Sequence, residues 1–215
     1  MTDKRDADQT LLDAIEVLKR SEVGRLVKAR IVQFGEMAKE SSTELFKELC
    51  FCILCANFAA ERSMKIQDAV GDGFLNLPEE RLAQELRALG HRFPNTRAQY
   101  IVEARKHKDF LKATIASFND GQALREWLIA NVKGLGPKEA SHFLRNIGYT
   151  EFAIVDFHIV DVLVKHGLIQ KPKTITKRRY LEIEKTLRRI AQRVNLNLAE
   201  LDLYLWYMET GKVLK

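Results

Sequence analysis

Lys138 and Asp156 are the two residues of this sequence whose types and surroundings could perform chemistry together. Lys138 begins the run KEASHFLRNIG, and Asp156 stands between the apolar residues 152–155 and the run FHIVDVLVKHG. A lysine amine is a nucleophile that forms Schiff bases, and a carboxylate stabilises positive charge that develops during a reaction. Asp156 also fits the N-cap of a helix, a structural role worth about 1 kcal/mol, and the two roles are compatible.

A tight turn precedes the lysine. An apolar helical pattern ends before residues 133–136 (KGLG), and Pro137 begins the next helix. Gly134 and Gly136 let the backbone turn sharply, and the N–H groups at the start of the second helix favour an anion such as a DNA phosphate. This pattern is typical of a helix-hairpin-helix motif, although the two glycines alone fit an ordinary hairpin of two helices at least as well.

The elements that must position these residues are helices. Nearly every segment has the helical apolar period, and only 4 prolines and 11 glycines interrupt the 215 residues, which predicts an all-α fold. Helices are expected at 78–89, 96–110 and 122–132, and a capping box at Ser41 opens another. The sequence is 46% hydrophobic, enough for one core or two small lobes.

The formal net charge of +6 is compatible with a polyanionic partner but does not require one. Basic residues crowd the stretch 171–193, a pattern that usually marks a solvated helix face, and part of this run is expected to face DNA. These residues are Lys171, Lys173, Lys177, Arg178, Arg179, Lys185, Arg188, Arg189 and Arg193.

No membrane partner is expected. The longest nearly apolar stretch, 49–60, is shorter than the roughly 20 residues that span a bilayer. The N-terminal residues MTDKRDADQT are charged and lack the apolar region of a secretory signal, which predicts a cytoplasmic protein.

Three cysteines stand close together as Cys50, Cys52 and Cys55 in the run LCFCILC. They could supply three thiolates to a metal, but structural metal sites usually take four ligands, and the apolar run is typical of a buried helix. We therefore expect core cysteines and no metal site.

The run GLGPKEASHFLRNIG, followed by AIVDFHIVDVL, resembles the helix-hairpin-helix DNA glycosylase superfamily. Three further features are similar to the type 2 8-oxoguanine DNA glycosylase/AP lyases of archaea and some thermophilic bacteria: HRFPNTRAQYI at 91–101, HFLRNIG, and a final lysine nine residues after Trp206. The resemblance implies two helical lobes with the hairpin at an interlobe DNA-binding cleft. We expect one lobe at 36–117 and the other at 1–35 plus 118–215, with the hairpin at about 122–148.

The resemblance also implies an activity, which is base excision repair of double-stranded DNA that contains 8-oxoguanine. Lys138 would attack the sugar, form a Schiff base and nick the abasic strand by β-elimination. Asp156 would mainly stabilise the cationic sugar, with proton shuttling from Lys138 as a secondary role. No cofactor is expected, because no cysteine follows Cys55 to hold the iron-sulfur cluster of some superfamily members.

Four other residues receive roles from the resemblance, and His142 receives one from its position one turn after Lys138 on the same helix face. Trp206 would stack on the extruded base, and Lys215 would close the pocket and help to distinguish 8-oxoguanine from guanine. Phe93 would wedge into the gap in the duplex, unless it only anchors its loop. His158 would contact a phosphate or be a buried helix histidine, and His142 would line the pocket or simply pack.

Two rival functions remain at this point. One is a glycosylase/lyase of the same fold for oxidised pyrimidines, against which the ending from Trp206 to Lys215 argues. The other is a hairpin module that only binds DNA, against which the pairing of Lys138 with Asp156 argues. A monomer in a prokaryotic cytoplasm, associated with the nucleoid through DNA, suits the family.

Overall fold

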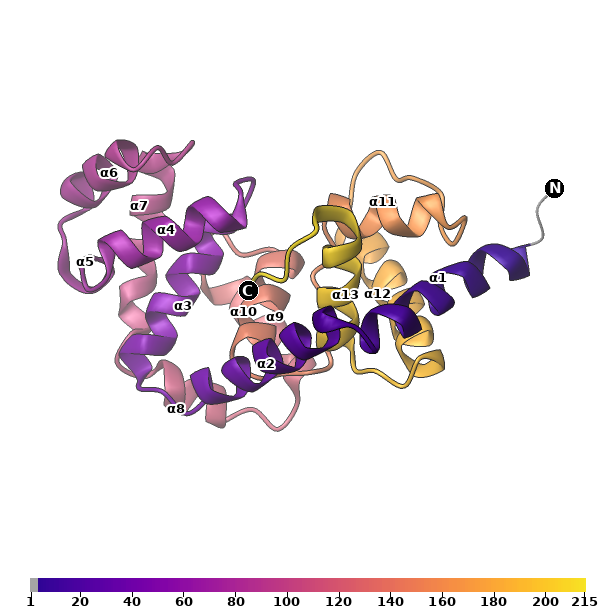
Figure 1. Ribbon diagram of the computed structural model, residues 1–215. Helices are drawn as coiled ribbons and strands as arrows, with labels where there is room; N and C mark the ends of the chain where they lie inside the picture. The colour runs from indigo at the N-terminus through magenta and orange to yellow at the C-terminus, as the bar shows by residue number, and fades with distance from the viewer. Residues whose placement is uncertain (1–3) are drawn as a thin grey trace. The chain divides into compact units, whose positions relative to one another are not determined.

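The computed structural model describes the backbone of residues 4–215 and the side chains from Gln9 onward (Figure 1). Thirteen α-helices and one short 3₁₀ helix make up the regular structure of this described part, which contains no strand. The predicted all-α class is confirmed. No helix within residues 4–215 is both long and apolar enough to cross a membrane.

Contacts divide the described chain into two units, residues 4–34 with 148–215 and residues 35–147. The lobes expected from the sequence group the hairpin with 118–215, whereas its two helices here belong to the unit of residues 35–147. The reason is packing, since the second hairpin helix contacts an apolar helix of that unit as well as the first hairpin helix. The lobe assignment made from the sequence stays a prediction.

The unit of residues 35–147 is built around helix α3, which contacts α4, α5, α7, α8 and α10 (Figure 1). Every residue from Glu48 to Cys55 is buried, and the three cysteines lie there, so the prediction of a buried helix is confirmed. The helices are α3 (Ser42–Cys55), α4 (Ala60–Val70), α5 (Gly73–Asn76), α6 (Glu79–Ala88), α7 (Pro94–Ala104), η1 (Arg105–His107), α8 (Leu111–Ala116), α9 (Gly121–Asn131) and α10 (Pro137–Asn146).

A buried polar network ties α3 to α4 and α10. The Glu48 carboxylate, 1% exposed, accepts hydrogen bonds from Asn146 Nδ2 at 2.7 Å and from Gln67 Nε2 at 3.2 Å. A buried charge is costly unless hydrogen bonds satisfy it. The network therefore fixes α10, and with it the start of the hairpin's second helix, against the core.

The helix expected at residues 96–110 differs from the observed one at both ends. The sequence predicts a single helix over residues 96–110, but α7 begins at Pro94 and changes at Arg105 to 3₁₀ geometry. Proline suits the first turn of a helix because its missing N–H needs no partner there. At this change of geometry the guanidinium of Arg105 donates hydrogen bonds to the carbonyl oxygens of Phe74 and Gly73.

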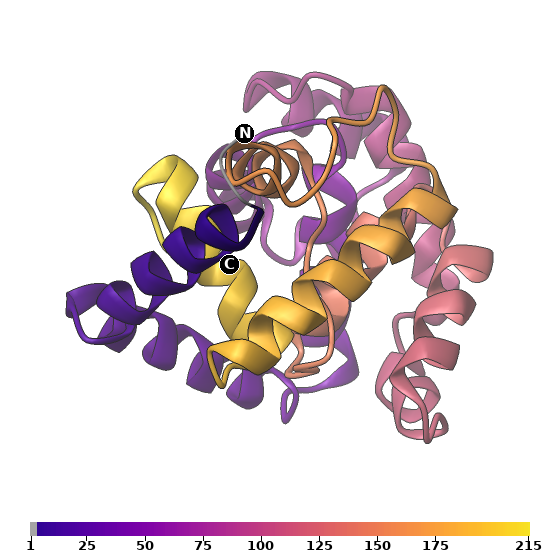
Figure 2. The same ribbon diagram turned by 90° about the vertical axis from the view of Figure 1, so that its right-hand side faces the viewer.

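The other unit has its core where four helices meet. Leu11, Ile159, Leu163, Leu187 and Leu201, all at most 1% exposed, belong to one apolar cluster, and each such side chain contributes about 1.5–3 kcal/mol when buried. Helices α12 and α13 lie against each other in this unit (Figure 2). Its helices are α1 (Lys4–Lys19), α2 (Glu22–Met37, whose last residues continue into 35–147), α11 (Phe157–Lys165), α12 (Lys177–Arg193) and α13 (Leu198–Thr210).

Candidate active site

The hairpin turn depends on Gly134 rather than on both of its glycines. Gly134 has a φ of +91°, and the ring of Tyr100 occupies the space of a Cβ, with Cδ2 2.3 Å from that position. Gly136 has a φ of −99°, which any residue adopts, and a Cβ there would lie 3.3 Å from Glu139 Oε2. Close approach of Tyr100 and the left-handed backbone therefore fix the residue type only at Gly134.

Lys138 is the second residue of α10, and its side chain is 28% exposed. Its Nζ lies 3.1 Å from Glu139 Oε1. The other oxygen of the same carboxylate, Oε2, accepts a hydrogen bond from the Gly136 N–H at 3.2 Å. Among the N–H groups at the start of this helix, that of Gly136 is thus already bound.

Sequence reasoning missed Glu139. A glutamate three residues after a helix N-cap commonly binds the N-cap N–H, so its position after Gly136 was the available signal. That pattern predicts the capping bond but says nothing about an ion pair with Lys138. Glu139 is 12% exposed in that ion pair.

A buried arginine holds the two hairpin helices together. Arg125 on α9 is 1% exposed. Its Nη1 donates to Ser141 Oγ on α10 at 3.0 Å, and its Nη2 donates to Gln122 Oε1 at 2.6 Å. These bonds fix α10 relative to α9 and so constrain the backbone that carries Lys138.

A cavity of about 410 Å³ lies beside the turn. Arg97, 6% exposed, donates from Nη2 to the Ala56 carbonyl oxygen at 2.6 Å, while its Nε has no hydrogen-bond partner among residues 9–215. Burial lowers the pKa of Arg97, and the charge of Glu139 opposes that shift. The lining residues are Ala56, Asn57, Phe93, Thr96, Arg97, Tyr100, Gly134 and Glu139.

Phe93 contributes to this cavity from the N-cap of α7. The guanidinium carbons of Arg92 and Arg97 lie 5.1 and 5.8 Å from its ring centre. Its N–H donates to His91 Nδ1 at 3.0 Å, and His91 Nε2 lies 3.1 Å from the Leu54 carbonyl oxygen. Phe93 is half-buried and well held, which fits the anchoring alternative and leaves the wedge role a prediction.

His142 is buried and packs against an aromatic ring. It is 5% exposed, and its ring meets that of Phe51 edge-on, with the centres 5.3 Å apart. This is the packing alternative of the sequence analysis. A role for His142 in substrate binding stays a prediction.

Asp156 is the N-cap of α11, as the sequence predicts, and its Oδ1 accepts a hydrogen bond from the Ile159 N–H at 3.0 Å. The non-helical segment before it is held from two helices. Asp202 on α13 accepts a hydrogen bond from the Ile154 N–H at 2.8 Å. The Tyr180 hydroxyl on α12 binds the backbone on either side of Ile154, at the Ala153 carbonyl oxygen and the Val155 N–H. No motif in the sequence points to these two supporting residues.

His158 and Trp206 lie together in the same unit as Asp156. Their ring centres are 4.7 Å apart with planes at 77°, in keeping with the packing of α11 on α13. His158 is exposed, so the alternative of a buried histidine is wrong. Trp206 Nε1 is buried without a hydrogen-bond partner in the described part of the chain. Lys215 is partly exposed beyond the end of α13.

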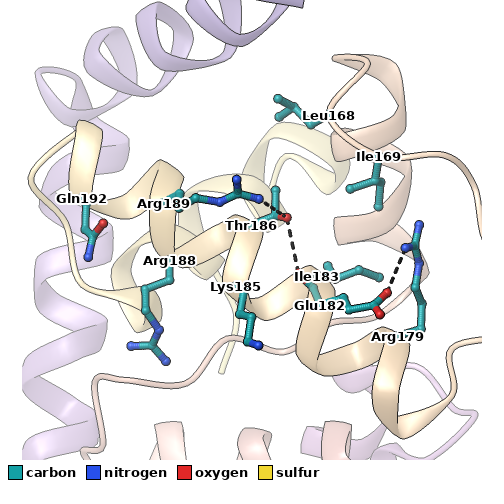
Figure 3. Close-up of a pocket in the computed structure, with 10 residues that line it drawn as sticks. All are labelled: Leu168, Ile169, Arg179, Glu182, Ile183, Lys185, Thr186, Arg188, Arg189 and Gln192. Carbon is teal, nitrogen blue, oxygen red and sulfur yellow. Dashed lines mark hydrogen bonds and ion pairs between the residues drawn. The ribbon is translucent and has the colours of Figure 1, made fainter.

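The basic run forms one side of a second cavity, about 660 Å³ in volume, between α12 and Leu168 with Ile169 (Figure 3). Arg189 Nη2 donates to Thr186 Oγ1 at 3.1 Å. Arg179 Nη1 forms an ion pair with Glu182 Oε2 at 3.1 Å, so this arginine already has a partner on its own helix. The basic side chains of this α12 groove are Arg179, Lys185, Arg188 and Arg189.

The sequence model of a protein family described as 8-oxoguanine DNA glycosylase matches residues 27–196. The 8-oxoguanine DNA glycosylase/AP lyase of Korarchaeum cryptofilum is 52% identical over 206 residues, which cover 95% of this chain and 98% of that protein. The enzyme of the same name from Methanocaldococcus jannaschii is also 52% identical, over 95% of this chain and 99% of that protein.

Solved structures agree with these sequence relatives. The crystal structure of the Methanocaldococcus jannaschii 8-oxoguanine glycosylase/lyase with DNA containing 8-oxoguanine has a TM-score of 0.93 and covers 96% of this chain and 100% of that one. The Thermotoga maritima 8-oxoguanine DNA glycosylase, 43% identical, has a TM-score of 0.90 and covers 97% of this chain and 100% of that one. An endonuclease III–DNA complex, 18% identical with a TM-score of 0.63, shares the fold.

Proposed function

The chain belongs to the 8-oxoguanine DNA glycosylase family, and we propose from this that it removes 8-oxoguanine from DNA and nicks the strand at the abasic site. The observation that carries the proposal is the 52% identity, over 95% of the chain, to relatives named for both activities. The partner is then double-stranded DNA, and the enzyme is bifunctional. A monomer that acts in a prokaryotic cytoplasm is the form we propose.

Lys138 is the proposed nucleophile. Once its amine is unprotonated, the nitrogen lone pair bonds to C1′ of the damaged nucleotide, and the bond from C1′ to the base breaks with its electron pair leaving on the base. Opening of the sugar ring gives a Schiff base, which makes the 2′ proton acidic. Loss of that proton expels the 3′ phosphate and nicks the strand.

The buried supports of α10 suit this role. Arg125 and the network at Glu48 hold the helix from two sides, so the backbone of Lys138 is fixed while its side chain keeps partial access to solvent. A nucleophile held in place loses little entropy when it meets its target, which is a major source of enzymatic rate.

Asp156 is the proposed stabiliser of the cationic sugar. Its Oδ1 is bound to the Ile159 N–H, so the carboxylate has a fixed orientation at the head of α11. A fixed charge stabilises a developing opposite charge without reorganising first. Proton shuttling remains its secondary proposed role.

The other proposed roles concern the extruded nucleotide. Trp206 stacks on the base, and His158, exposed beside it, contacts a phosphate. Lys215 supports discrimination, because 8-oxoguanine differs from guanine by an N7 hydrogen and a C8 oxygen that a polar group can detect. Phe93 fills the gap in the duplex, and His142 supports the pocket from within α10.

Borohydride trapping tests the proposed substrate, the Schiff-base chemistry and the nucleophile together. Purified protein is incubated with a duplex containing one 8-oxoguanine, and with matched duplexes containing guanine or an oxidised pyrimidine. We expect a covalent adduct with 8-oxoguanine alone, lost in Lys138→Gln. No adduct on any duplex would leave only DNA binding, and an adduct on the pyrimidine duplex alone would assign the other substrate class.

A further inference from the structure

Glu139 holds the Lys138 ammonium with one oxygen and the Gly136 N–H with the other. A carboxylate bound in this way cannot swing away from the lysine without giving up the cap of α10. The distance from Oε1 to Nζ is 3.1 Å, within the roughly 2.6–3.2 Å over which a general base takes a proton. Glu139 is thus placed to act on the nucleophile itself.

The charge of this carboxylate also acts on a second cation, Arg97. Arg97 and Glu139 line the same cavity, and the charge of Glu139 is among the causes that act on the pKa of Arg97. Tyr100 is the other titratable residue of that cavity. The carboxylate therefore lies within electrostatic reach of a buried guanidinium as well as of the ammonium of Lys138.

We propose that Glu139 accepts the proton that Lys138 must lose before it attacks C1′. This inference rests on the proposed function and gives two carboxylates different roles. Glu139 takes the proton in place of the secondary shuttling role proposed for Asp156. Asp156, whose Oδ1 is bound to the Ile159 N–H, offsets the positive charge of the sugar.

The step balances without another reagent. A proton moves from Lys138 Nζ to Glu139 Oε1, and the freed lone pair forms the bond from Nζ to C1′. The bond from C1′ to the base breaks, and its electron pair leaves on the base. The proton on Glu139 is then available to the departing base, which restores the carboxylate.

The test compares Glu139→Gln with wild type in single-turnover base excision and in borohydride trapping. Glutamine keeps an acceptor for the Gly136 N–H but cannot take the lysine proton. We expect both rates to fall about 100-fold or more, the usual scale of acid–base catalysis, with DNA affinity within about twofold. A rate within about threefold of wild type would show that Glu139 is only a cap, and the inference would be overturned.

Glu200→Gln is the matched control. Glu200 occupies the same capping position on α13, where its Oε2 accepts from the Asn197 N–H at 3.0 Å. We expect this variant to lose a similar amount of thermal stability to Glu139→Gln while keeping the wild-type excision rate. A fall in rate equal to that of Glu139→Gln would assign the effect to capping and overturn the inference.

Glu139→Asp provides the rescue. It keeps a carboxylate next to Lys138, so it should be at least about tenfold faster than the glutamine variant, and it also serves if that variant does not fold. An aspartate variant that folds and traps no faster than Glu139→Gln would contradict the proton-acceptor role. A different result would contradict the proposed function itself, namely a wild-type protein that forms no covalent adduct dependent on Lys138.

Discussion

The Tyr180 hydroxyl donates a hydrogen bond to the carbonyl oxygen of Ala153 at 2.8 Å. The hydroxyl oxygen of Tyr180 also accepts from the Val155 N–H at 3.3 Å, so one side chain of α12 holds the backbone directly before Asp156. The orientation of the Asp156 carboxylate therefore depends on a residue far along the chain.

Tyr180→Phe should slow base excision by about tenfold and lower stability by roughly 1–3 kcal/mol for each buried backbone group left unsatisfied. Single-turnover rates and denaturant unfolding measure the two effects. Tyr204→Phe, also buried but on α13, is the control that leaves the segment before Asp156 intact. Equal falls in rate for the two variants would contradict the positioning role.

Gly134→Ala should destabilise the hairpin, because the backbone is left-handed and Tyr100 fills the space of the new Cβ. Backbone strain alone costs about 1–3 kcal/mol, and displacement of the ring adds to it. Gly136→Ala is the matched control and should cost less, since its φ is ordinary. Thermal unfolding of both variants checks the order, and a reversed order would be inconsistent with this geometry.

His91 should make the free energy of unfolding depend on pH. Burial lowers the pKa of His91 below its usual value of 6.5, so between the two values the unfolded chain binds the proton and the folded one does not. Stability is then fully present above about pH 6.5 and falls as the pH drops through that window. His91→Asn, which keeps an acceptor for the Phe93 N–H, should reduce this fall between about pH 7 and 5, whereas an unchanged pH profile would exclude His91 as its source.

Lys215→Met should reduce the preference for 8-oxoguanine over guanine by about tenfold or more, because the ammonium that could donate a hydrogen bond to the C8 oxygen would be missing. Nicking of a preformed abasic site should stay within about twofold, since Lys138 is untouched. Excision rates on the two duplexes and nicking on the third measure this. An unaltered preference would remove Lys215 from the discrimination of the base.

The basic side chains of the α12 groove should contribute to DNA binding. Replacing Lys185 and Arg189 with glutamine should weaken binding and lower the slope of log affinity against log salt by about one for each phosphate that is no longer neutralised. The same replacements at Arg25 and Lys28 on α2, outside the groove, serve as controls. If the α12 variants and the α2 controls had equal slopes of log affinity against log salt, the basic run would be only a solvated surface.

Local signals in the sequence predicted two helices closely and the cap at Asp156, whereas the helix expected at 96–110 differs at both ends. Apolar spacing placed α6 and α9 to within one or two residues, and the N-cap of α11 followed from an aspartate before an apolar helix. The hydrogen bonds that orient the site were not predictable in this way. Tyr180 and Asp202 reach the segment before Asp156 from helices far along the chain, and no local pattern encodes such pairings.

The depth of α3 has a chemical consequence. Burial raises the pKa of the Cys50 thiol well above its usual range, so the thiolate that peroxides attack is scarce. Cys52 and Cys55 are shielded in the same helix. An enzyme with the proposed function meets the oxidants that made the lesion, and its three cysteine thiols are buried within one helix.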